Sequence, residues 1–174
     1  MNIIIVGLGT AGKHYLNLIK NKKNIKIYVI DKSVLSTSKN YKQITLKDIS
    51  EKKLHFDYAF IASPSGSHFE HAMFFLKIGS NVLIEKPFVL RLDHARKLIQ
   101  ISSKKKLKCW TSLQNRYNLA TSKLKSEIKL KSIGKINLVD CCVTFFNDLI
   151  SFFLYSSANF GEAILLTAIR PIVA

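Results

Sequence analysis

The chain has 174 residues, of which 48% are hydrophobic and 22% charged, a composition that predicts one folded domain or one domain and part of a second, and excludes an intrinsically disordered chain. A formal net charge of +16 raises nucleic acid or an anionic membrane surface as partners. However, only four of the 27 basic residues are arginine and the lysines are spread along the whole chain, so we interpret the charge as a solvated basic surface and expect no nucleic-acid partner.

Short apolar runs alternate with longer amphipathic ones along the first 130 residues. The apolar runs predict buried strands at residues 2–6, 25–30, 58–62, 81–84 and 108–113, with a short strand and turn at 44–49. Helical spacing of apolar side chains predicts helices at residues 11–22, 69–78 (ended by Gly79), 93–105 and 119–130. Strands and helices that alternate through short connections form parallel sheets with right-handed crossovers. The fold class is therefore α/β, a doubly wound parallel sheet of the Rossmann type.

A glycine-rich segment joins the first predicted strand to the first predicted helix. Gly7 permits a tight turn, Gly9 lets the backbone approach a pyrophosphate, and Gly12 permits close packing of helix on strand. The first turn of the helix offers unpaired N–H groups and a partial positive charge to the phosphates. This pattern predicts a dinucleotide site formed by Gly7, Gly9, Thr10, Ala11 and Gly12.

Asp31 ends the second strand, nineteen residues after Gly12. A carboxylate at that position accepts hydrogen bonds from the ribose hydroxyls of an adenosine and repels a 2′-phosphate. Asp31 therefore favours NAD as the cofactor. NADP remains the alternative, because Lys32 and Ser33 follow directly and weaken the repulsion.

Three further segments carry a family resemblance: Ala62-Ser63-Pro64-Ser65-Gly66-Ser67-His68, Glu85-Lys86-Pro87, and Gln114-Asn115-Arg116-Tyr117-Asn118. In this order and spacing, behind the glycine segment, they resemble the signatures of the glucose–fructose oxidoreductase and inositol dehydrogenase family (Gfo/Idh/MocA). The resemblance covers residues 1 to about 140. It implies hydride transfer between a nicotinamide cofactor and a carbon of a sugar, cyclitol or sugar nucleotide. It also implies cofactor contacts from Ser63, Pro64, His68, Glu85, Lys86, Gln114 and Arg116, and a cis peptide bond before Pro87.

Lys86 is the residue to which the resemblance assigns the chemistry. The apolar run at 82–84 before it indicates a buried side chain, and burial lowers the pKa of a lysine so that it exchanges a proton with a reacting oxygen more readily. Ser67 and His68 have a different expected part, which is to cap the following helix and support the loop. We therefore predict Lys86 as the catalytic residue and no metal ligands.

The carboxyl-terminal part departs from the family pattern. Residues 1–118 match the NAD(P)-binding domain, whereas 119–174 resemble a linker helix and an incomplete substrate domain. Residues 135–143 resemble the first strand of that domain, but no histidine follows at the helix-like segment 161–167, where the family carries a catalytic one. We therefore expect a truncated or frameshifted gene product. The alternatives are a cofactor-binding remnant without catalysis or, less favoured, a basic nucleic-acid-binding protein.

Other expectations concern compartment and assembly. The amino terminus has no basic segment ahead of its apolar run, unlike a signal peptide, and no apolar stretch reaches the ~18 residues of a membrane helix. The three cysteines match no zinc or redox spacing. We expect a cytoplasmic protein with free thiols that does not contact a membrane. The sequence leaves open the oligomeric state and the identity of the sugar-like substrate.

Overall fold

The computed structural model describes residues 1–33, 38–134, 144–146 and 149–151. It divides into two compact units, residues 1–112 (unit 1) and residues 113–174 (unit 2). Each unit is described by itself.

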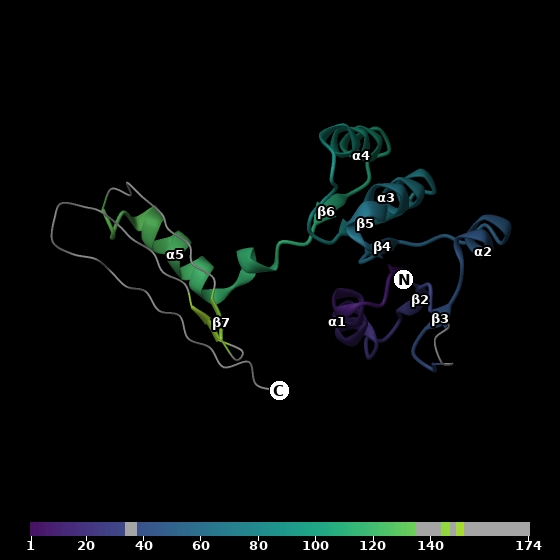
Figure 1. The fold of residues 1–174 in the computed structure, drawn as a ribbon, viewed down its shortest axis with the longest axis horizontal. Helices are drawn as coiled ribbons and strands as arrows, with labels where there is room; N and C mark the ends of the chain where they lie inside the picture. Colours follow the sequence, from purple (N-terminus) through teal and green to yellow (C-terminus); the bar gives the residue numbers. More distant parts are fainter. Residues whose placement is uncertain (34–37, 135–143, 147–148, 152–174) are drawn as a thin grey trace. The chain divides into compact units, whose positions relative to one another are not determined.

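A single parallel sheet of six strands forms the centre of unit 1 (Figure 1). Its strand order is β3-β2-β1-β4-β5-β6, and all neighbours pair in parallel. This is the strand order of a dinucleotide-binding doubly wound fold, with the order reversing between β1 and β4. The predicted fold class is confirmed. The strands are β1 (Asn2–Val6), β2 (Lys26–Ile30), β3 (Lys42–Gln43), β4 (Tyr58–Ile61), β5 (Asn81–Ile84) and β6 (Cys109–Thr111).

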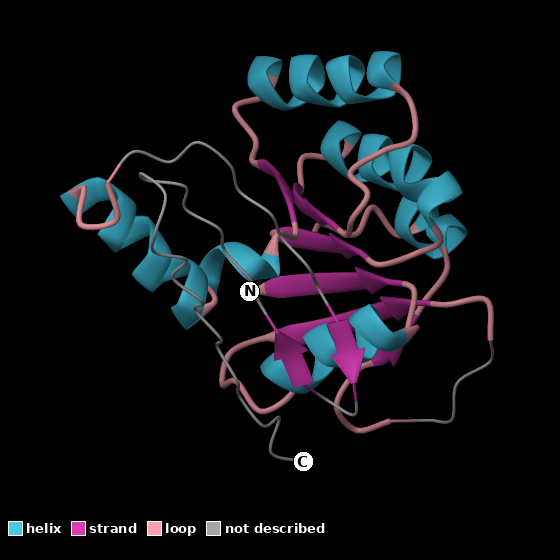
Figure 2. Ribbon diagram, turned by 60° about the vertical axis from the view of Figure 1, so that its left-hand side comes forward, coloured by secondary structure: helices cyan, strands magenta, loops and turns pink. Residues whose placement is uncertain are grey.

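Helices cover both faces of this sheet (Figure 2). Successive side chains of β1 show the division, because Ile4 belongs to one buried cluster and Ile5 to the other, and both are fully buried. Tyr15 of one helix packs in the cluster around Ile5, while residues of the other three helices pack in the cluster around Ile4. A strand buried on both faces reads as a continuous apolar run. The helices are α1 (Thr10–Ile19), α2 (Leu46–Glu51), α3 (His68–Lys77) and α4 (Leu92–Lys104).

Gly79 ends α3, as the sequence predicts. Its φ of +93° is left-handed, and its N–H donates to the carbonyl of Leu76 at 3.2 Å while the N–H of Ser80 donates to Phe75 at 2.9 Å. These two bonds satisfy carbonyls that the last turn leaves unpaired. The short connection lets the chain enter β5 directly.

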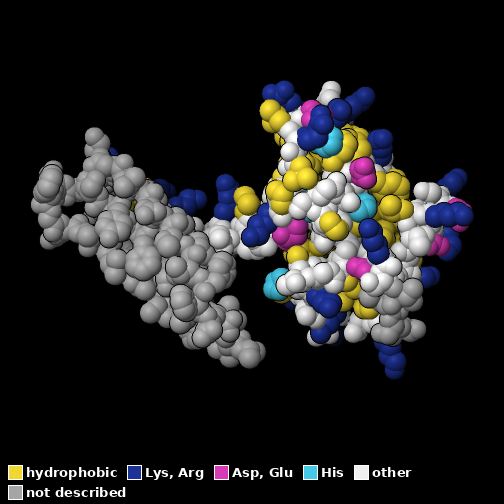
Figure 3. All heavy atoms as spheres, viewed as in Figure 1, with side chains coloured by type: hydrophobic (Ala, Val, Ile, Leu, Met, Phe, Trp, Pro, Cys, Tyr) yellow, Lys and Arg dark blue, Asp and Glu magenta, His cyan; other side chains and the backbone are white. Residues whose placement is uncertain are grey.

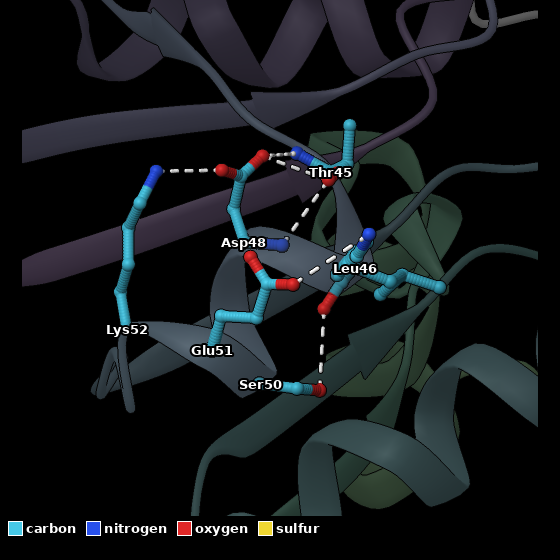
Figure 4. A network of polar contacts seen from close by, with 7 residues as sticks. Thr45, Leu46, Asp48, Ser50, Glu51 and Lys52 are labelled. Carbon is cyan, nitrogen blue, oxygen red and sulfur yellow. Dashed lines mark hydrogen bonds and ion pairs between the residues drawn. The ribbon is translucent and has the colours of Figure 1, made fainter.

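The predicted strand and turn at 44–49 is wrong. β3 ends at Gln43, and α2 begins at Leu46. Thr45 caps this helix: its Oγ1 accepts the N–H of Asp48 at 3.2 Å, and Oδ2 of Asp48 accepts the N–H of Thr45 at 2.9 Å (Figure 4). This reciprocal pair stabilises a helix N-terminus. The cap therefore favours a helix over a strand in this segment, although the helix has only six residues.

Unit 2 contains one helix and a strand pair among its described residues. A 3₁₀ turn, η2 (Gln114–Tyr117), precedes α5 (Leu119–Leu130). The side chain of Asn118 caps α5 by accepting the N–H of Ala120 at 2.8 Å. The predicted helix at 119–130 is thus confirmed. β7 (Thr144–Phe146) and β8 (Leu149–Ser151) pair antiparallel. The predicted strand at 135–143 lies outside the described residues.

No helix in the described parts of either unit combines the length and the apolar character that crossing a bilayer requires.

Candidate cofactor site

The predicted residues of unit 1 gather at one edge of the sheet. The glycine loop follows β1, Asp31 follows β2, Ser63 follows β4 and Lys86 follows β5. Because these four strands are parallel, their carboxyl ends meet at the same edge. In open α/β sheets, ligands bind at that edge, where the strand order reverses.

Two glycines of the loop are required by packing. Gly7 has a left-handed φ of +92°, and a Cβ on it would lie 2.6 Å from the carbonyl oxygen of Ala62. A Cβ on Gly12 would lie 1.9 Å from the carbonyl oxygen of Gly7. Contacts this short do not occur, so a side chain at either position forces the backbone to move. The roles predicted for Gly7 and Gly12 agree with this geometry.

Gly9 differs from both, because a Cβ there would meet no protein atom within 4 Å. It is the N-cap of α1 and supplies no side-chain hydrogen bond, and the first turn carries no acidic residue. The N–H groups of the first turn, including those of Thr10 and Ala11, therefore keep their capacity to bind an anion. Since nothing in the protein requires glycine here, the residue fits close approach by the pyrophosphate of a dinucleotide.

Asp31 holds the glycine loop in addition to its predicted role. Its Oδ2 accepts the N–H of Leu8 at 2.6 Å, and its Oδ1 accepts the N–H of Ser33 at 2.9 Å. These bonds, led by that from Leu8, hold the pKa of the Asp31 carboxyl below its usual range. An ionised carboxylate has about four acceptor positions. Asp31 can thus hold the loop and still accept from ribose hydroxyls.

The loop after β4 contains Ser63, Pro64 and His68. Oγ of Ser63 lies 2.9 Å from Nδ1 of His71, one turn into α3, and burial lowers the pKa of His71. Pro64 is exposed and precedes a short 3₁₀ turn, η1 (Ser65–Ser67). The contact with His71 holds the Ser63 side chain against α3.

His68 is buried, with 1% of its surface exposed. Its Nε2 lies 2.8 Å from the carbonyl oxygen of Ser63, and its Nδ1 lies 2.8 Å from that of Pro87. The expected capping of α3 by Ser67 is wrong, because this side chain makes no capping hydrogen bond. Ser67 lies in a 3₁₀ turn that runs directly into α3. The backbone of this turn therefore precedes the helix where a capping side chain was expected. His68 joins two loops.

Glu85 and Lys86 lie side by side but in opposite environments. Glu85 is 8% exposed and accepts a hydrogen bond from the hydroxyl of Tyr15, whereas Lys86 is exposed. The expected burial of Lys86 is therefore wrong within the described chain. The buried run at 82–84 ends at Glu85, and the next residue turns outward. The peptide bond between Lys86 and Pro87 is cis, as the resemblance implies.

Sequence reasoning missed Tyr15 and Ser112 as parts of this edge. The hydroxyl of Tyr15 contacts Glu85 and lies 2.8 Å from Oγ of Ser112, the residue after β6. Burial and the Glu85 carboxylate raise the pKa of Tyr15 to about 12. These residues lie 70 and 97 positions from Tyr15, so no local pattern announces the contact.

Gln114 and Arg116 lie in η2, which belongs to unit 2. Their contact with a cofactor stays a prediction. Within the described residues, no group of three or more His, Cys, Asp or Glu side chains is placed to hold a metal ion.

Comparisons with known proteins agree with this geometry. Residues 1–113 match the family model described as "Oxidoreductase family, NAD-binding Rossmann fold". A D-xylose 1-dehydrogenase (NADP⁺) of Hypocrea jecorina is 34% identical over 80 residues, 46% of this chain and 20% of that protein. Mouse biliverdin reductase A is 28% identical over 107 residues, 59% of this chain and 36% of that protein.

Solved structures extend the similarity to the fold. The structure of scyllo-inositol dehydrogenase from Lactobacillus casei, with bound NAD(H) and scyllo-inositol, superposes with a TM-score of 0.68 at 25% identity, over 80% of this chain and 44% of that chain. This chain thus spans less than half the length of each of these proteins. The match over residues 1–113, together with the strand order and glycine loop, shows that the chain belongs to the Gfo/Idh/MocA oxidoreductase family through its NAD-binding Rossmann domain.

Proposed function

We propose that the chain binds NAD across the carboxyl edge of unit 1. The pyrophosphate lies at Gly9 and the first turn of α1, and the adenosine ribose lies at Asp31. The observation that supports this most directly is the contrast among the glycines: Gly7 and Gly12 are required by protein contacts, but Gly9 adjoins open space. The bond from Leu8 to Asp31 at 2.6 Å joins the two halves of this subsite.

The nicotinamide then lies on the other side of β1, near the loops after β4 and β5. Asp31 follows β2 and Lys86 follows β5, three strand spacings away in the order β2-β1-β4-β5. With neighbouring strands ~4.8 Å apart, this is roughly 14 Å. An extended dinucleotide can bridge such a span, with Ser63 and Pro64 between its ends.

The proposed reaction is reversible hydride transfer to a carbonyl carbon of a sugar, cyclitol or sugar nucleotide. The bound cofactor supplies the hydride. Lys86 contributes the proton: its ammonium donates a hydrogen bond to the carbonyl oxygen and releases the proton to that oxygen as the alcohol forms. In the other direction, the lysine amine takes the proton of the hydroxyl. Its exposed position leaves it within reach of a substrate from outside unit 1.

Both the cofactor form and the substrate class rest on residues and relatives together. The Asp31 carboxylate favours NAD, while adjacent Lys32 and a relative named for NADP⁺ keep NADP as the second choice. A xylose dehydrogenase and an inositol dehydrogenase among the similar proteins support a polyhydroxylated substrate. The biliverdin reductase shows that the same domain type also occurs with a quite different substrate.

Two other functions make different predictions. A cofactor-binding chain without catalysis shares the whole NAD site and differs only in turnover. A nucleic-acid-binding protein needs a continuous basic surface. On the visible face of unit 1, Lys and Arg side chains stand in separate groups among apolar and uncharged ones (Figure 3). We therefore favour the oxidoreductase.

The test is an NADH-formation assay with the full chain, NAD and a panel of aldoses, inositols and sugar nucleotides. The oxidoreductase predicts turnover with at least one polyol that Lys86→Met lowers about 100-fold or more, as for a lost general acid–base group. Lys97→Met, at an exposed lysine of α4, is the matched control and retains activity. NADH binding without turnover on any substrate supports the second function. Activity that survives Lys86→Met contradicts the assignment of Lys86.

A further inference from the structure

Lys86 is exposed, yet both of its neighbours along the chain are held by buried polar side chains. Glu85 precedes it and contacts Tyr15 of α1. Pro87 follows it, and its carbonyl oxygen lies 2.8 Å from Nδ1 of His68 of α3. The two supports come from helices that pack on opposite faces of the sheet.

The support from α1 ends on the backbone of Lys86 itself. The Glu85 carboxylate receives the Tyr15 hydroxyl at Oε1, and its Oε2 accepts the Lys86 N–H at 3.2 Å. Ser112 also contacts the tyrosine, with its Oγ 2.8 Å from the phenol oxygen of Tyr15. Tyr15 and Ser112 are each 8% exposed, so water competes little for these bonds. The Tyr15 hydroxyl and the Lys86 N–H thus bind different oxygens of the Glu85 carboxylate. Because Tyr15 holds the carboxylate in one orientation, the carboxylate in turn holds the backbone N–H of Lys86.

The support from α3 joins the two loops of the nicotinamide side. The imidazole of His68, 1% exposed, lies between the carbonyl oxygens of Ser63 and Pro87, 2.8 Å from each. Movement of the Lys86 loop away from the Ser63 loop therefore breaks a buried contact. A buried polar group left without its partner destabilises the displaced loop.

We propose that Tyr15 and His68 are positioning residues for Lys86. From opposite faces of the sheet they hold the chain before and after it, at Glu85 and Pro87, so that its side chain lies at the nicotinamide end of the cofactor. The proposal rests on the proposed function. Neither residue touches the cofactor in it, and both act through the loop at 85–87. Because Tyr15 lies on the same helix whose first turn faces the pyrophosphate, it also links the phosphate end of the site to the nicotinamide end.

A comparison of two ligands tests this role, using the full chain and calorimetry. NADH contains the nicotinamide, whereas ADP-ribose contains only the part that lies at α1 and Asp31. Tyr15→Phe is expected to weaken NADH about fivefold or more, a typical effect for a lost buried hydrogen bond to a carboxylate, and to leave ADP-ribose within about twofold. His68→Asn is expected to do the same. Tyr41→Phe, a half-buried tyrosine of the same core, is the control and changes neither affinity.

A second background separates positioning from general structural support. If Tyr15 acts through Lys86, the affected interaction is the one between the Lys86 side chain and the nicotinamide end of NADH, which Lys86→Met already removes. Adding Tyr15→Phe to Lys86→Met then changes NADH affinity by less than about twofold. An equal loss in both backgrounds overturns the proposal. So does a loss of ADP-ribose binding that parallels the loss of NADH. If the unaltered chain binds neither ligand, the proposed function itself fails, which is distinct from wild-type binding with no effect of the variants.

Discussion

The N–H of Leu8 donates a hydrogen bond to Oδ2 of Asp31 across 2.6 Å, so the acidic residue at the end of β2 holds the loop that follows β1. Removing this carboxylate affects both the loop and the ribose subsite. We expect Asp31→Ala to weaken NADH binding about tenfold or more, since hydrogen bonds to a charged acceptor are the stronger kind.

Asp57 provides the matched control for Asp31. Its Oδ2 accepts the N–H of Asn2 at 2.7 Å, but it precedes β4 and thus lies at the amino edge of the sheet. Asp57→Ala is expected to lower the free energy of unfolding by about 1–3 kcal/mol and to leave NADH affinity unchanged. Equal effects of the two variants on binding contradict the placement of the cofactor at the carboxyl edge.

The glycine loop predicts opposite outcomes for two alanine substitutions. Gly12→Ala places a Cβ 1.9 Å from the carbonyl oxygen of Gly7, and we expect the free energy of unfolding to fall by about 3 kcal/mol or more. Gly9→Ala meets no protein atom within 4 Å and is expected to lower it by only about 0.5 kcal/mol, yet to weaken NADH binding. Urea unfolding and calorimetry measure the two quantities. Gly9→Ala with unchanged affinity is inconsistent with a pyrophosphate there.

The cap of α2 predicts a pH dependence of stability. Hydrogen bonds from Lys52 and Thr45 hold the pKa of Asp48 well below its usual range. The unfolded chain, in which an Asp has a pKa of about 3.9, therefore takes up this proton first as the pH falls. The contribution of Asp48 is present above about pH 4 and is lost as the pH drops below that value. Urea unfolding between about pH 7 and pH 3 is expected to show a smaller acid loss for Asp48→Asn than for the unaltered chain.

Glu51→Gln is the control for Asp48→Asn, because Glu51 lies on the same short helix and pairs with exposed Lys47 across 3.6 Å. It is expected to follow the pH profile of the unaltered chain. If Asp48→Asn follows that profile as well, the cap does not stabilise the protein in solution.

The raised pKa of Tyr15 predicts a loss of stability at alkaline pH. Its pKa is raised to about 12 by burial and by Glu85, above the ordinary value of about 10 in an unfolded chain. The folded state therefore keeps this proton longer, so the contribution is complete below about pH 10 and is lost as the pH rises from there toward 12. In an ultraviolet titration of tyrosinate, Tyr15→Phe is expected to remove a late-titrating group. Glu85→Gln is expected to shift that group to lower pH, and titration of Tyr15 together with ordinary tyrosines argues against the buried contact.

Much of the fold follows from the sequence because the relevant physics is local. A continuous apolar run such as residues 2–6 fits only a strand buried on both faces. The glycines of the loop could be predicted because they lie at fixed offsets from the strand. Gly7 and Gly12 are required by backbone contacts there, whereas Gly9 adjoins open space. The prediction of a strand and turn at 44–49 is wrong for an equally local reason. The segment contains the apolar residues Ile44, Leu46 and Ile49, but Thr45 and Asp48 have the spacing of a reciprocal helix cap.

The candidate site was less predictable where it depends on contacts distant in the sequence. Tyr15 reads as an apolar position of a helix, and only the packed structure brings its hydroxyl to Glu85 and Ser112. The exposure of Lys86 was missed because burial along β5 says nothing about the residue after the strand. His68 is part of a segment that resembles a family signature. Its contacts with the carbonyl oxygens of Ser63 and Pro87 form only when the loops after β4 and β5 come together in the fold.

The proposed function requires that this chain binds a nicotinamide dinucleotide at the carboxyl edge of unit 1. Calorimetric titration of the full chain with NADH, in parallel with NADPH, tests it most directly. We expect saturable binding of one NADH per chain, tighter than that of NADPH, with the preference for NADH reduced in Asp31→Ala. A chain that circular dichroism shows to be folded, and that binds neither cofactor, would contradict it.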